Sequence, residues 1–373
     1  MEKKQDKIFV TRPVLPTLSA FRSQCADIWK SGVVTNNGPK VRYLEELLAD
    51  YLEVDFVSLV SSGTAGLMLA SRLLGQEVGR CITTPYSFCA STASPRWAGL
   101  SIDFTDVGAN SVNICTDALE RYLLRARARS LIIAVHCYGF ACDVSRLEEI
   151  SKANNCPLLY DASHAFGVSV SGKSLLGFGD VSVASLHATK TFNTVEGGLV
   201  ISKDLAIKNE LDLLRNFGFS GEDKIVRDGL NAKMSEIHAA IGIENLKSFK
   251  KDTERRSKIC QDYDDFFIDN FPSIETFREF RPDSWNFGYY PILVENRDTL
   301  WRQLKSQGVM ARRYFYPILS DLEFSERSNN SSAFPNAREL ASSVLCLPIY
   351  PQLTKSDFKF ICRCLEKSLV DGL

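Results

Sequence analysis

Two hydrophobic periods alternate along the chain from about residue 40 to residue 250. Apolar residues between 40 and 52 recur every three or four positions, including Val41, Leu44 and Leu48, which predicts an amphipathic helix. Short apolar runs, typical of buried strands, alternate with further helix-length stretches, and this alternation predicts an α/β domain with a mainly parallel sheet covered by helices on both faces. The predicted strands lie at 55–60, 80–85, 130–139, 157–161, 181–186 and 198–202, and the helices between and after them at 64–74, 144–154 and 205–218.

The pattern changes after a long amphipathic stretch at 234–263. Beyond residue 275 the chain shows a few short strand-like and helix-like segments, with a polar loop predicted over 324–336. We therefore predict a large α/β domain over residues 1–250 and a smaller C-terminal α+β domain over residues 251–373.

Composition narrows the possible function. The 373 residues carry a formal net charge of −1 without a basic block, which argues against nucleic acid as a partner. No apolar run reaches the length of a membrane span, and the charged start has no signal-type core, so we expect a cytoplasmic protein that does not contact a membrane. The eleven cysteines form no CxxC pair and share no zinc-type spacing with the four histidines, so we expect free thiols in a reducing compartment and no metal site.

The strongest candidate chemistry lies at two junctions where a predicted strand ends. One strand ends in Asp161, and 29 residues later a lysine, Lys190, occupies the polar turn between two apolar runs. A lysine in such a turn is usually only solvated. Together with a strand-end aspartate, however, it is typical of a pyridoxal 5'-phosphate (PLP) site, where the amine binds the cofactor aldehyde and the carboxylate keeps the pyridine nitrogen protonated.

Three other junctions have both a functional and a structural interpretation. The turn 61–66, SSGTAG, opens a helix and suits an anion, but Ser and Thr also favour that position as simple caps. Phe88 suits stacking on a cofactor ring or ordinary core packing. His164 lies one turn after Asp161, near the expected ring hydroxyl, or is a satisfied core histidine. The glycine motifs of nicotinamide and P-loop nucleotide sites are absent from the sequence.

The motifs SSGTAGL, PYSFCAST, YDASHAFG, SLHATKTFNTVEGGLV and GLNAKMSEIHAAIG resemble, in order and spacing, those of the DegT/DnrJ/EryC1/StrS family of sugar aminotransferases. The resemblance covers nearly the whole chain. It implies a PLP-dependent enzyme of fold type I, the aspartate aminotransferase-like fold, that acts on nucleotide-linked ketosugars as a homodimer.

The resemblance also implies a role for each matching residue. Lys190, Asp161 and His164 would be catalytic, and in a homodimer a polar residue of the partner subunit would also reach the cofactor phosphate. The other residues implied to bind the cofactor are Gly63, Thr64, Phe88 and Ser185, with Asn231 or Lys233 supplied by the partner. Those implied to bind the substrate are Asn36, Asn37, His187, Tyr314 and Tyr316.

The family's activity sets the expected reaction. Some relatives replace the lysine by histidine and perform dehydration, whereas this chain keeps Lys190, which indicates transamination from L-glutamate. The stretch HATK followed by EGG resembles relatives that aminate C4, which implies conversion of dTDP-4-dehydro-6-deoxy-D-glucose to dTDP-4-amino-4,6-dideoxy-D-glucose for O-antigen synthesis. A C3 aminotransferase, a UDP- or GDP-linked 4-ketosugar aminotransferase and a non-catalytic regulatory homologue stay open as alternatives.

Overall fold

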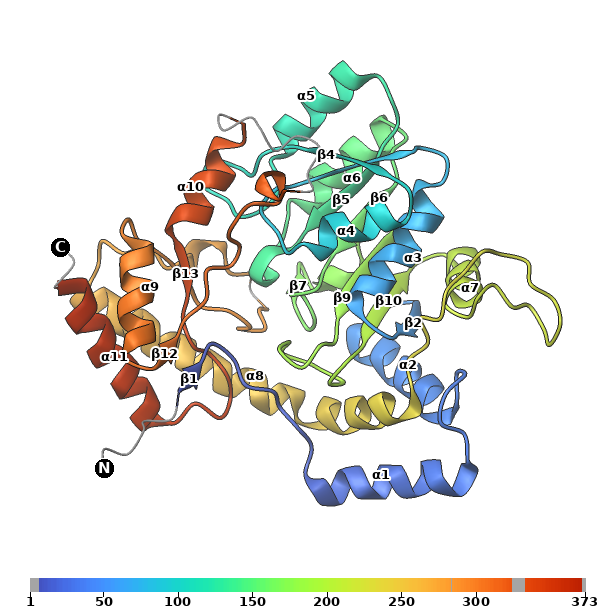
Figure 1. Cartoon of the computed structure of the whole chain (residues 1–373), viewed down its shortest axis with the longest axis horizontal. Helices are drawn as coiled ribbons and strands as arrows, with labels where there is room; N and C mark the ends of the chain where they lie inside the picture. The colour runs from blue at the N-terminus through green and yellow to red at the C-terminus, as the bar shows by residue number, and fades with distance from the viewer. Residues whose placement is uncertain (1–6, 283, 324–332, 371–373) are drawn as a thin grey trace.

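A computed structural model describes residues 7–282, 284–323 and 333–370, so most of the predicted loop at 324–336 lies outside the described residues (Figure 1). The centre is a seven-stranded sheet with the order β2-β10-β9-β6-β5-β3-β4. β10 is antiparallel to both of its neighbours, and the pairs from β9 to β4 are parallel, which confirms the expected mainly parallel sheet. The strands are β2 (Phe56–Val60), β3 (Arg80–Thr83), β4 (Ser101–Phe104), β5 (Leu131–Val135), β6 (Leu158–Asp161), β9 (Val181–Ser185) and β10 (Gly198–Ser202).

Helices cover both faces of this sheet (Figure 1). All five residues of β5 are buried, and the first four of them alternate between two hydrophobic cores, one on each face of the sheet. Ile132 and Ala134 pack with the layer of α2, α5, α6 and α8, whereas Leu131 and Ile133 pack with the layer of α3 and α7. The helices are α2 (Pro39–Leu52), α3 (Gly63–Gly75), α4 (Ala90–Trp97), α5 (Thr116–Ala126), α6 (Val144–Ala153), α7 (Leu205–Leu214) and α8 (Glu236–Asn270).

Side-chain caps define where several of these helices begin. Ser62 accepts a hydrogen bond from the Ala65 N–H at 3.0 Å and starts α3, and Asp143 accepts from the Arg146 N–H at 3.0 Å and starts α6. Such caps satisfy N–H groups that lack intrahelical partners, so the chain turns from strand to helix at a defined residue. The predicted helices at 40–52, 64–74, 144–154, 205–218 and 234–263 correspond to α2, α3, α6, α7 and α8.

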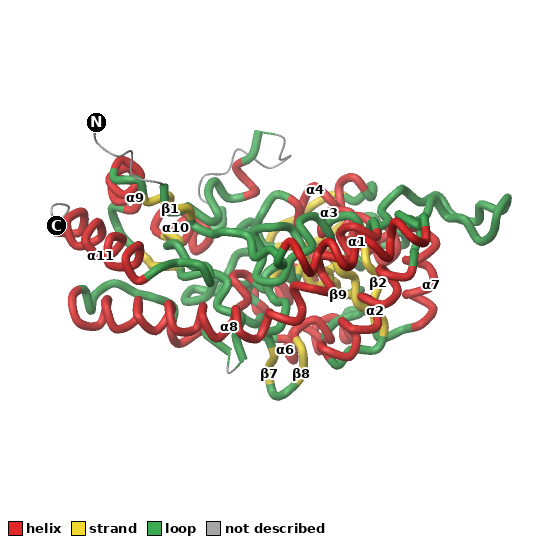
Figure 2. Tube along the Cα trace, turned by 90° about the horizontal axis from the view of Figure 1, so that it is seen from below, coloured by secondary structure: helices red, strands yellow, loops and turns green. Residues whose placement is uncertain are grey.

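The C-terminal part is built on the far half of α8, which extends beyond the sheet (Figure 2). Its two small sheets pair β11 with β13 and, in parallel, β1 with β12, so the N-terminal strand lies in the C-terminal part. The division at residue 250 stays a prediction, and that position lies inside α8. The remaining elements are β1 (Ile8–Phe9), α1 (Leu18–Ser31), β7 (Ser169–Val170), β8 (Lys173–Ser174), β11 (Pro291–Leu293), α9 (Arg297–Ser306), β12 (Val309–Met310), α10 (Pro335–Ser343), β13 (Val344–Cys346) and α11 (Lys355–Val370).

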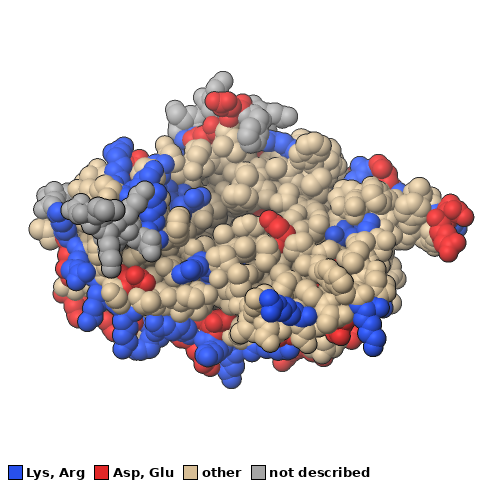
Figure 3. Space-filling model, turned by 60° about the horizontal axis from the view of Figure 1, so that its bottom comes forward, with Lys and Arg blue, Asp and Glu red and all other residues tan. Residues whose placement is uncertain are grey.

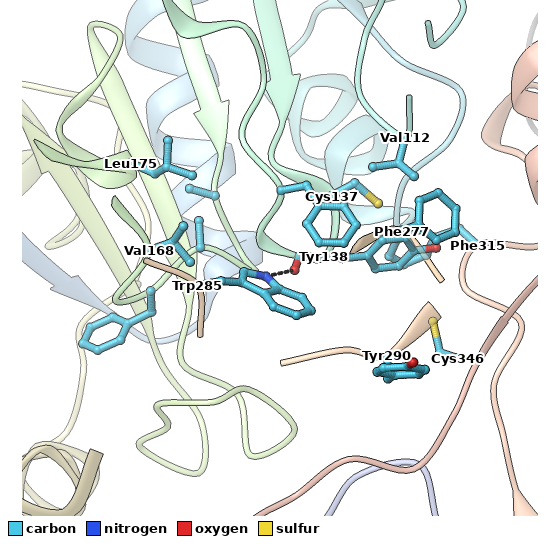
Figure 4. Close-up of a cluster of buried hydrophobic side chains, with 14 of the residues drawn as sticks. Val112, Cys137, Tyr138, Val168, Leu175, Phe277, Trp285, Tyr290, Phe315 and Cys346 are labelled. Atoms are coloured by element: carbon cyan, nitrogen blue, oxygen red, sulfur yellow. Dashed lines mark hydrogen bonds between the residues drawn. The ribbon is translucent and has the colours of Figure 1, made fainter. Parts of the chain in front are cut away.

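A buried aromatic cluster joins the C-terminal part to the end of β5 (Figure 4). The indole N–H of Trp285 donates to the Tyr138 carbonyl at 3.0 Å, and its ring lies 5.2 Å from that of Phe140. The hydroxyls of Tyr86 and Tyr138 both donate to the Tyr314 carbonyl. These contacts hold the segment around Tyr314 over the carboxyl ends of the parallel strands, where ligands bind in such sheets.

The surface is mixed in charge. Lys and Arg side chains are interspersed with Asp and Glu over the face shown in Figure 3, in keeping with the near-zero net charge. Among the described helices, none combines the length and apolarity needed to cross a membrane. None of the eleven cysteines, all within the described ranges, forms a disulfide.

Candidate active site

A cavity of about 330 Å³ lies at the carboxyl ends of β5, β6 and β9 and at the N-terminus of α3. It brings together the three residues predicted to be catalytic and six of the other predicted site residues. The predicted residues that line it are Gly63, Thr64, Phe88, Asp161, His164, Ser185, His187, Lys190 and Tyr314.

Asp161 ends β6 and is buried, with 4% of its surface exposed. Ser91 donates to one carboxylate oxygen at 2.6 Å, and Ser163 donates to the other through both its hydroxyl (2.6 Å) and its N–H (3.2 Å). Within the described residues, no lysine, arginine or histidine lies within salt-bridge distance of this carboxylate. A buried carboxylate without a cation is costly, so its environment fits a site completed by a cationic group such as a protonated pyridine.

Lys190 follows β9 in the turn 187–190 and lines the same cavity. Burial lowers the pKa of this amine to about 8, although the negative charge of Asp161 acts to raise it. A lysine that is partly neutral near pH 8 can act as a nucleophile and as a base. This is the property that binding an aldehyde and moving a proton both require.

His164 follows Asp161 by three residues, and the centre of its ring is 4.5 Å from that of Tyr289 and 5.8 Å from that of Phe315. Its Nδ1 accepts a hydrogen bond from the backbone N–H of Tyr138 at 3.0 Å. Burial, with a smaller effect of the Lys190 charge, lowers the pKa of the ring well below its ordinary value. The ring is therefore neutral with its proton on Nε2, so it offers the cavity a hydrogen-bond donor without a charge.

The N-terminus of α3 meets the end of β9 on one wall of the cavity. A Cβ added to Gly63 would lie 2.9 Å from the Ser185 Cβ, so only glycine allows the helix to approach this closely. Gly63, Thr64 and Ser185 line the cavity with helix N–H groups and small polar side chains. Such a wall can bind an anion, and it fits the phosphate of PLP.

The rim of the cavity carries His187 and Glu196. The Nδ1 of His187 accepts from the Thr189 N–H at 3.2 Å, which leaves Nε2 facing Glu196 at 3.7 Å. Phe88 stands at the rim with 57% of its surface exposed, and so offers an aromatic face to a ligand in the cavity.

Five predicted site residues lie outside this cavity as one chain forms it. Asn36 and Asn37, both with positive φ, precede α2, and the Asn37 side chain is 3.5 Å from Arg215. Tyr316 is half exposed and packs against Arg313. Asn231 pairs with Asn216, and the amine of Lys233 lies 4.8 Å from the Phe217 ring. Their predicted contacts with ligands stay predictions.

Several lining residues had not been singled out from the sequence. Ser91, which does not line the cavity but binds Asp161, is the second residue of α4 and follows Phe88 by three positions in the same motif, so its spacing could have indicated it. Tyr289, Arg312 and Phe315 come from segments remote in sequence, and their residue types alone give no sign of a shared site. The additional lining residues are Ser62, Leu67, Ser87, Ala90, Val135, Ser163, Thr189, Glu196, Gly197, Tyr289, Arg312 and Phe315.

One cavity of this mainly parallel sheet brings together an aspartate at the end of β6, a lysine in the turn after β9 and the N-terminus of α3. This combination defines a PLP-dependent enzyme of fold type I. The chain belongs to the DegT/DnrJ/EryC1/StrS aminotransferase family, whose model matches residues 18–366. It is accordingly a PLP-dependent nucleotide-sugar aminotransferase.

Similarity to individual relatives extends over more than nine-tenths of the chain. A dTDP-4-amino-4,6-dideoxy-D-glucose transaminase of Shigella dysenteriae is 39% identical, covering 96% of this chain and 98% of the relative. A protein of the same name from Escherichia coli is 35% identical, covering 93% and 94%. The crystal structure of DesI in the presence of its TDP-sugar product matches with a TM-score of 0.92 at 28% identity, covering 99% of this chain and 94% of that one.

Proposed function

We propose that this enzyme transfers the amino group of L-glutamate to C4 of dTDP-4-dehydro-6-deoxy-D-glucose and forms dTDP-4-amino-4,6-dideoxy-D-glucose. The observation that carries the proposal is the similarity, at 35–39% identity over more than nine-tenths of the chain, to two transaminases named for this product. We further propose a role in O-antigen synthesis and a cytoplasmic location, which the eleven free thiols support because disulfides are rare in reducing compartments.

Lys190 is proposed to hold the cofactor through its amine and to move the proton in each half of the reaction. PLP supplies the electron-withdrawing ring that makes the substrate C–H bond acidic. The lysine accepts that proton because its lowered pKa keeps part of the amine neutral near pH 8. The same group returns a proton when the ketosugar is aminated, so the two halves share one base and kinetics are ping-pong.

Asp161 and His164 are proposed to position the cofactor ring. The hydrogen bonds from Ser91 and Ser163 orient the carboxylate and leave lone pairs on it for the pyridine N–H. Neutral His164, whose Nδ1 accepts from the Tyr138 N–H, would donate its Nε2–H to the ring hydroxyl. Phe88 would cover one face of the ring, and Gly63, Thr64 and Ser185, which line the cavity, would hold the phosphate.

A homodimer is proposed to complete the site. Asn231 and Lys233 lie outside the cavity of their own chain, in the segment next to the exposed Phe217. If this segment reaches the cavity of a second copy, one of the two side chains supplies a polar contact to the phosphate there. Asn36, Asn37 and Tyr316 are proposed to line the outer, nucleotide-binding part of the same composite site, and His187 and Tyr314 its inner part.

Steady-state kinetics with matched acceptors tests the proposal. The 4-keto-6-deoxy sugars linked to dTDP, UDP and GDP are compared with L-glutamate as the common donor. We expect the dTDP substrate to give a kcat/KM at least about tenfold above the others, the discrimination that roughly 1.4 kcal/mol of differential transition-state binding supplies. A higher value for another carrier would replace the proposed substrate.

A further inference from the structure

Lys190 stands in a loop, residues 186–197, that connects β9 to β10. The two arms of this loop are joined to each other, because the Ala188 N–H donates to the Val195 carbonyl at 2.7 Å. A loop is more mobile than the strands that it connects, so a side chain on it is held at a reacting atom only by further contacts with rigid elements. The structure supplies such contacts on the side of the loop that faces away from the cavity.

Asn193 is the first of them. It is fully buried, its Oδ1 accepts from the Val195 N–H at 3.1 Å, and its Nδ2 donates to the Val14 carbonyl at 3.1 Å. Val195 has a φ of 70°, which is strained for a β-branched residue and persists only where the surroundings fix it. Asn193 therefore holds the loop in this conformation and joins it to the N-terminal segment of the chain.

A second buried asparagine, Asn245 of α8, completes the connection. Its Nδ2 donates to the Asn193 carbonyl at 2.9 Å and to the Val14 carbonyl at 3.3 Å. Two side chains thus converge on the Val14 carbonyl, whose oxygen has a lone pair for each. The Lys190 loop is therefore tied at one point to both the long helix and the N-terminal segment.

The N-terminal segment 10–14 is itself anchored at its other end. It follows β1, which pairs with β12 in the C-terminal part of the chain. Its residues Val10 and Thr11 line a small second cavity together with Thr189, the residue before Lys190. The segment thus runs beside the Lys190 loop, from the C-terminal part to the two asparagines.

We infer that Asn193 is a positioning residue for Lys190, and that it places the lysine by fixing the loop to segment 10–14 and to α8. The inference rests on the proposed role of Lys190. Asn193 is absent from the described residues that line the cavity, so it acts through the loop and not by contact with a ligand. Because misplacing a reacting group by about 1 Å can cost roughly 10²-fold in rate, such an anchor matters for turnover.

The first test compares Asn193→Ala with Asn336→Ala in the cofactor-free protein. The side chain of Asn336 likewise donates to a carbonyl remote in sequence, that of Val107, at 3.0 Å, but it lies outside the cavity lining. Hydrogen exchange, followed by mass spectrometry, reports on the loop 186–197 directly. We expect exchange in this loop to be at least about tenfold faster in Asn193→Ala and unchanged in Asn336→Ala, because only the first variant releases the loop.

The second test follows the two half-reactions of the PLP-bound enzyme by absorbance, with L-glutamate added to the PLP form and the dTDP ketosugar to the aminated form. We expect Asn193→Ala to lower the maximal rate of both halves at least about tenfold and by a similar factor, because Lys190 moves the proton in each. The concentration for half-maximal rate should stay within about threefold of wild type. Asn245→Ala, which leaves the Asn193 side chain intact, should show a smaller loss in the same direction and serves as the test if Asn193→Ala does not fold.

Unchanged loop exchange and unchanged maximal rates in the asparagine variants would overturn the inference. Equal losses in Asn336→Ala, or a change confined to the half-maximal concentration, would do the same. Borohydride reduction of the wild-type PLP form tests the role of Lys190 separately. Cofactor on another residue would overturn that role and the inference with it, whereas cofactor on Lys190 supports the role and makes any failure of the Asn193 comparison a failure of this inference alone.

Discussion

The hydroxyl of Ser91 donates a 2.6 Å hydrogen bond to Oδ2 of Asp161, across 70 residues of sequence. Ser91 is itself 2.7 Å from the hydroxyl of Ser87, and Ser163 binds the second carboxylate oxygen. The carboxylate is thus held at both ends by neutral donors. This arrangement fixes its orientation and, within the described residues, leaves it without a salt-bridge partner, a place that a cationic ring nitrogen would fill.

Ser91→Ala should weaken the cofactor site without unfolding the protein. The substitution removes one charge-assisted hydrogen bond, worth about 1.5–3 kcal/mol, so we expect the Kd for PLP to rise roughly tenfold or more. Equilibrium dialysis with PLP measures this. Ser151→Ala, which removes a 2.7 Å serine-to-carbonyl hydrogen bond in α6 away from the cavity, is the control and should bind PLP like wild type. Equal affinity in both variants would show that Ser91 does not orient Asp161.

Lys190→Ala should abolish turnover. We expect a loss of at least about 10³-fold, because the variant lacks both the group that holds the cofactor and the base that moves the proton. Borohydride reduction followed by peptide mapping should place the cofactor on Lys190 in wild type and nowhere in the variant. Lys173→Ala, at an exposed position in β8, is the control. Substantial turnover in Lys190→Ala without an added amine would refute the assignment.

The lowered pKa of Lys190 predicts a pH-dependent stability of the cofactor-free protein. In the folded state the pKa is about 8, against an ordinary 10.5, so between these values the unfolded chain binds a proton that the folded chain does not. The contribution of this group to the free energy of unfolding therefore rises with pH across that window. Relative to Lys190→Met, wild type should gain on the order of 3 kcal/mol between pH 7 and pH 10.5, at about 1.4 kcal/mol per pH unit.

Urea unfolding of the two cofactor-free proteins at a series of pH values measures that difference. Using the difference removes the contribution of every other titrating group that the two proteins share. A constant difference from pH 7 to pH 10.5 would mean that the Lys190 amine has an ordinary pKa in the folded state.

A shared active site predicts complementation between two inactive proteins. Lys190→Ala supplies an intact Asn231 and Lys233, and the double variant Asn231→Ala/Lys233→Ala supplies an intact Lys190. Each should be weak alone, but random mixing of subunits should restore about a quarter of the wild-type sites, since half of the dimers are mixed and each has one intact site. Activity that stays at the sum of the separate variants would indicate a site made by one chain.

Much of the fold could be predicted because its strands are buried on both faces and its helices are capped. β5 and β6 are continuous apolar runs, and Ser62 and Asp143 mark helix starts by residue type alone. β4 could not be predicted in this way, since Ser101 is exposed and Asp103 interrupts its apolar pattern. α1 also gave no clear signal, because Ile28 is its one fully buried residue.

Site residues could be predicted where the chemistry requires a particular residue type at the junction between a strand and the turn or helix that follows it. Lys190, Asp161 and Gly63 are of this kind, and the cavity brings them together. The sequence could not show that Arg312 lines the cavity, because the adjacent Arg313 has the same residue type but binds Asp298 instead. Asn36, Asn37 and Lys233 lie outside the cavity of one chain, and a single sequence does not say which surface a second copy covers.

The most direct test of the account is the position of the transferred nitrogen. The enzyme is incubated with ¹⁵N-labelled L-glutamate and dTDP-4-dehydro-6-deoxy-D-glucose, and the purified nucleotide sugar is examined by NMR for coupling between ¹⁵N and the ring carbons. The account predicts a single amino sugar labelled at C4, with formation of 2-oxoglutarate in equal amount. Label at C3, or no labelled sugar from an enzyme that glutamate converts to its aminated form, would contradict it.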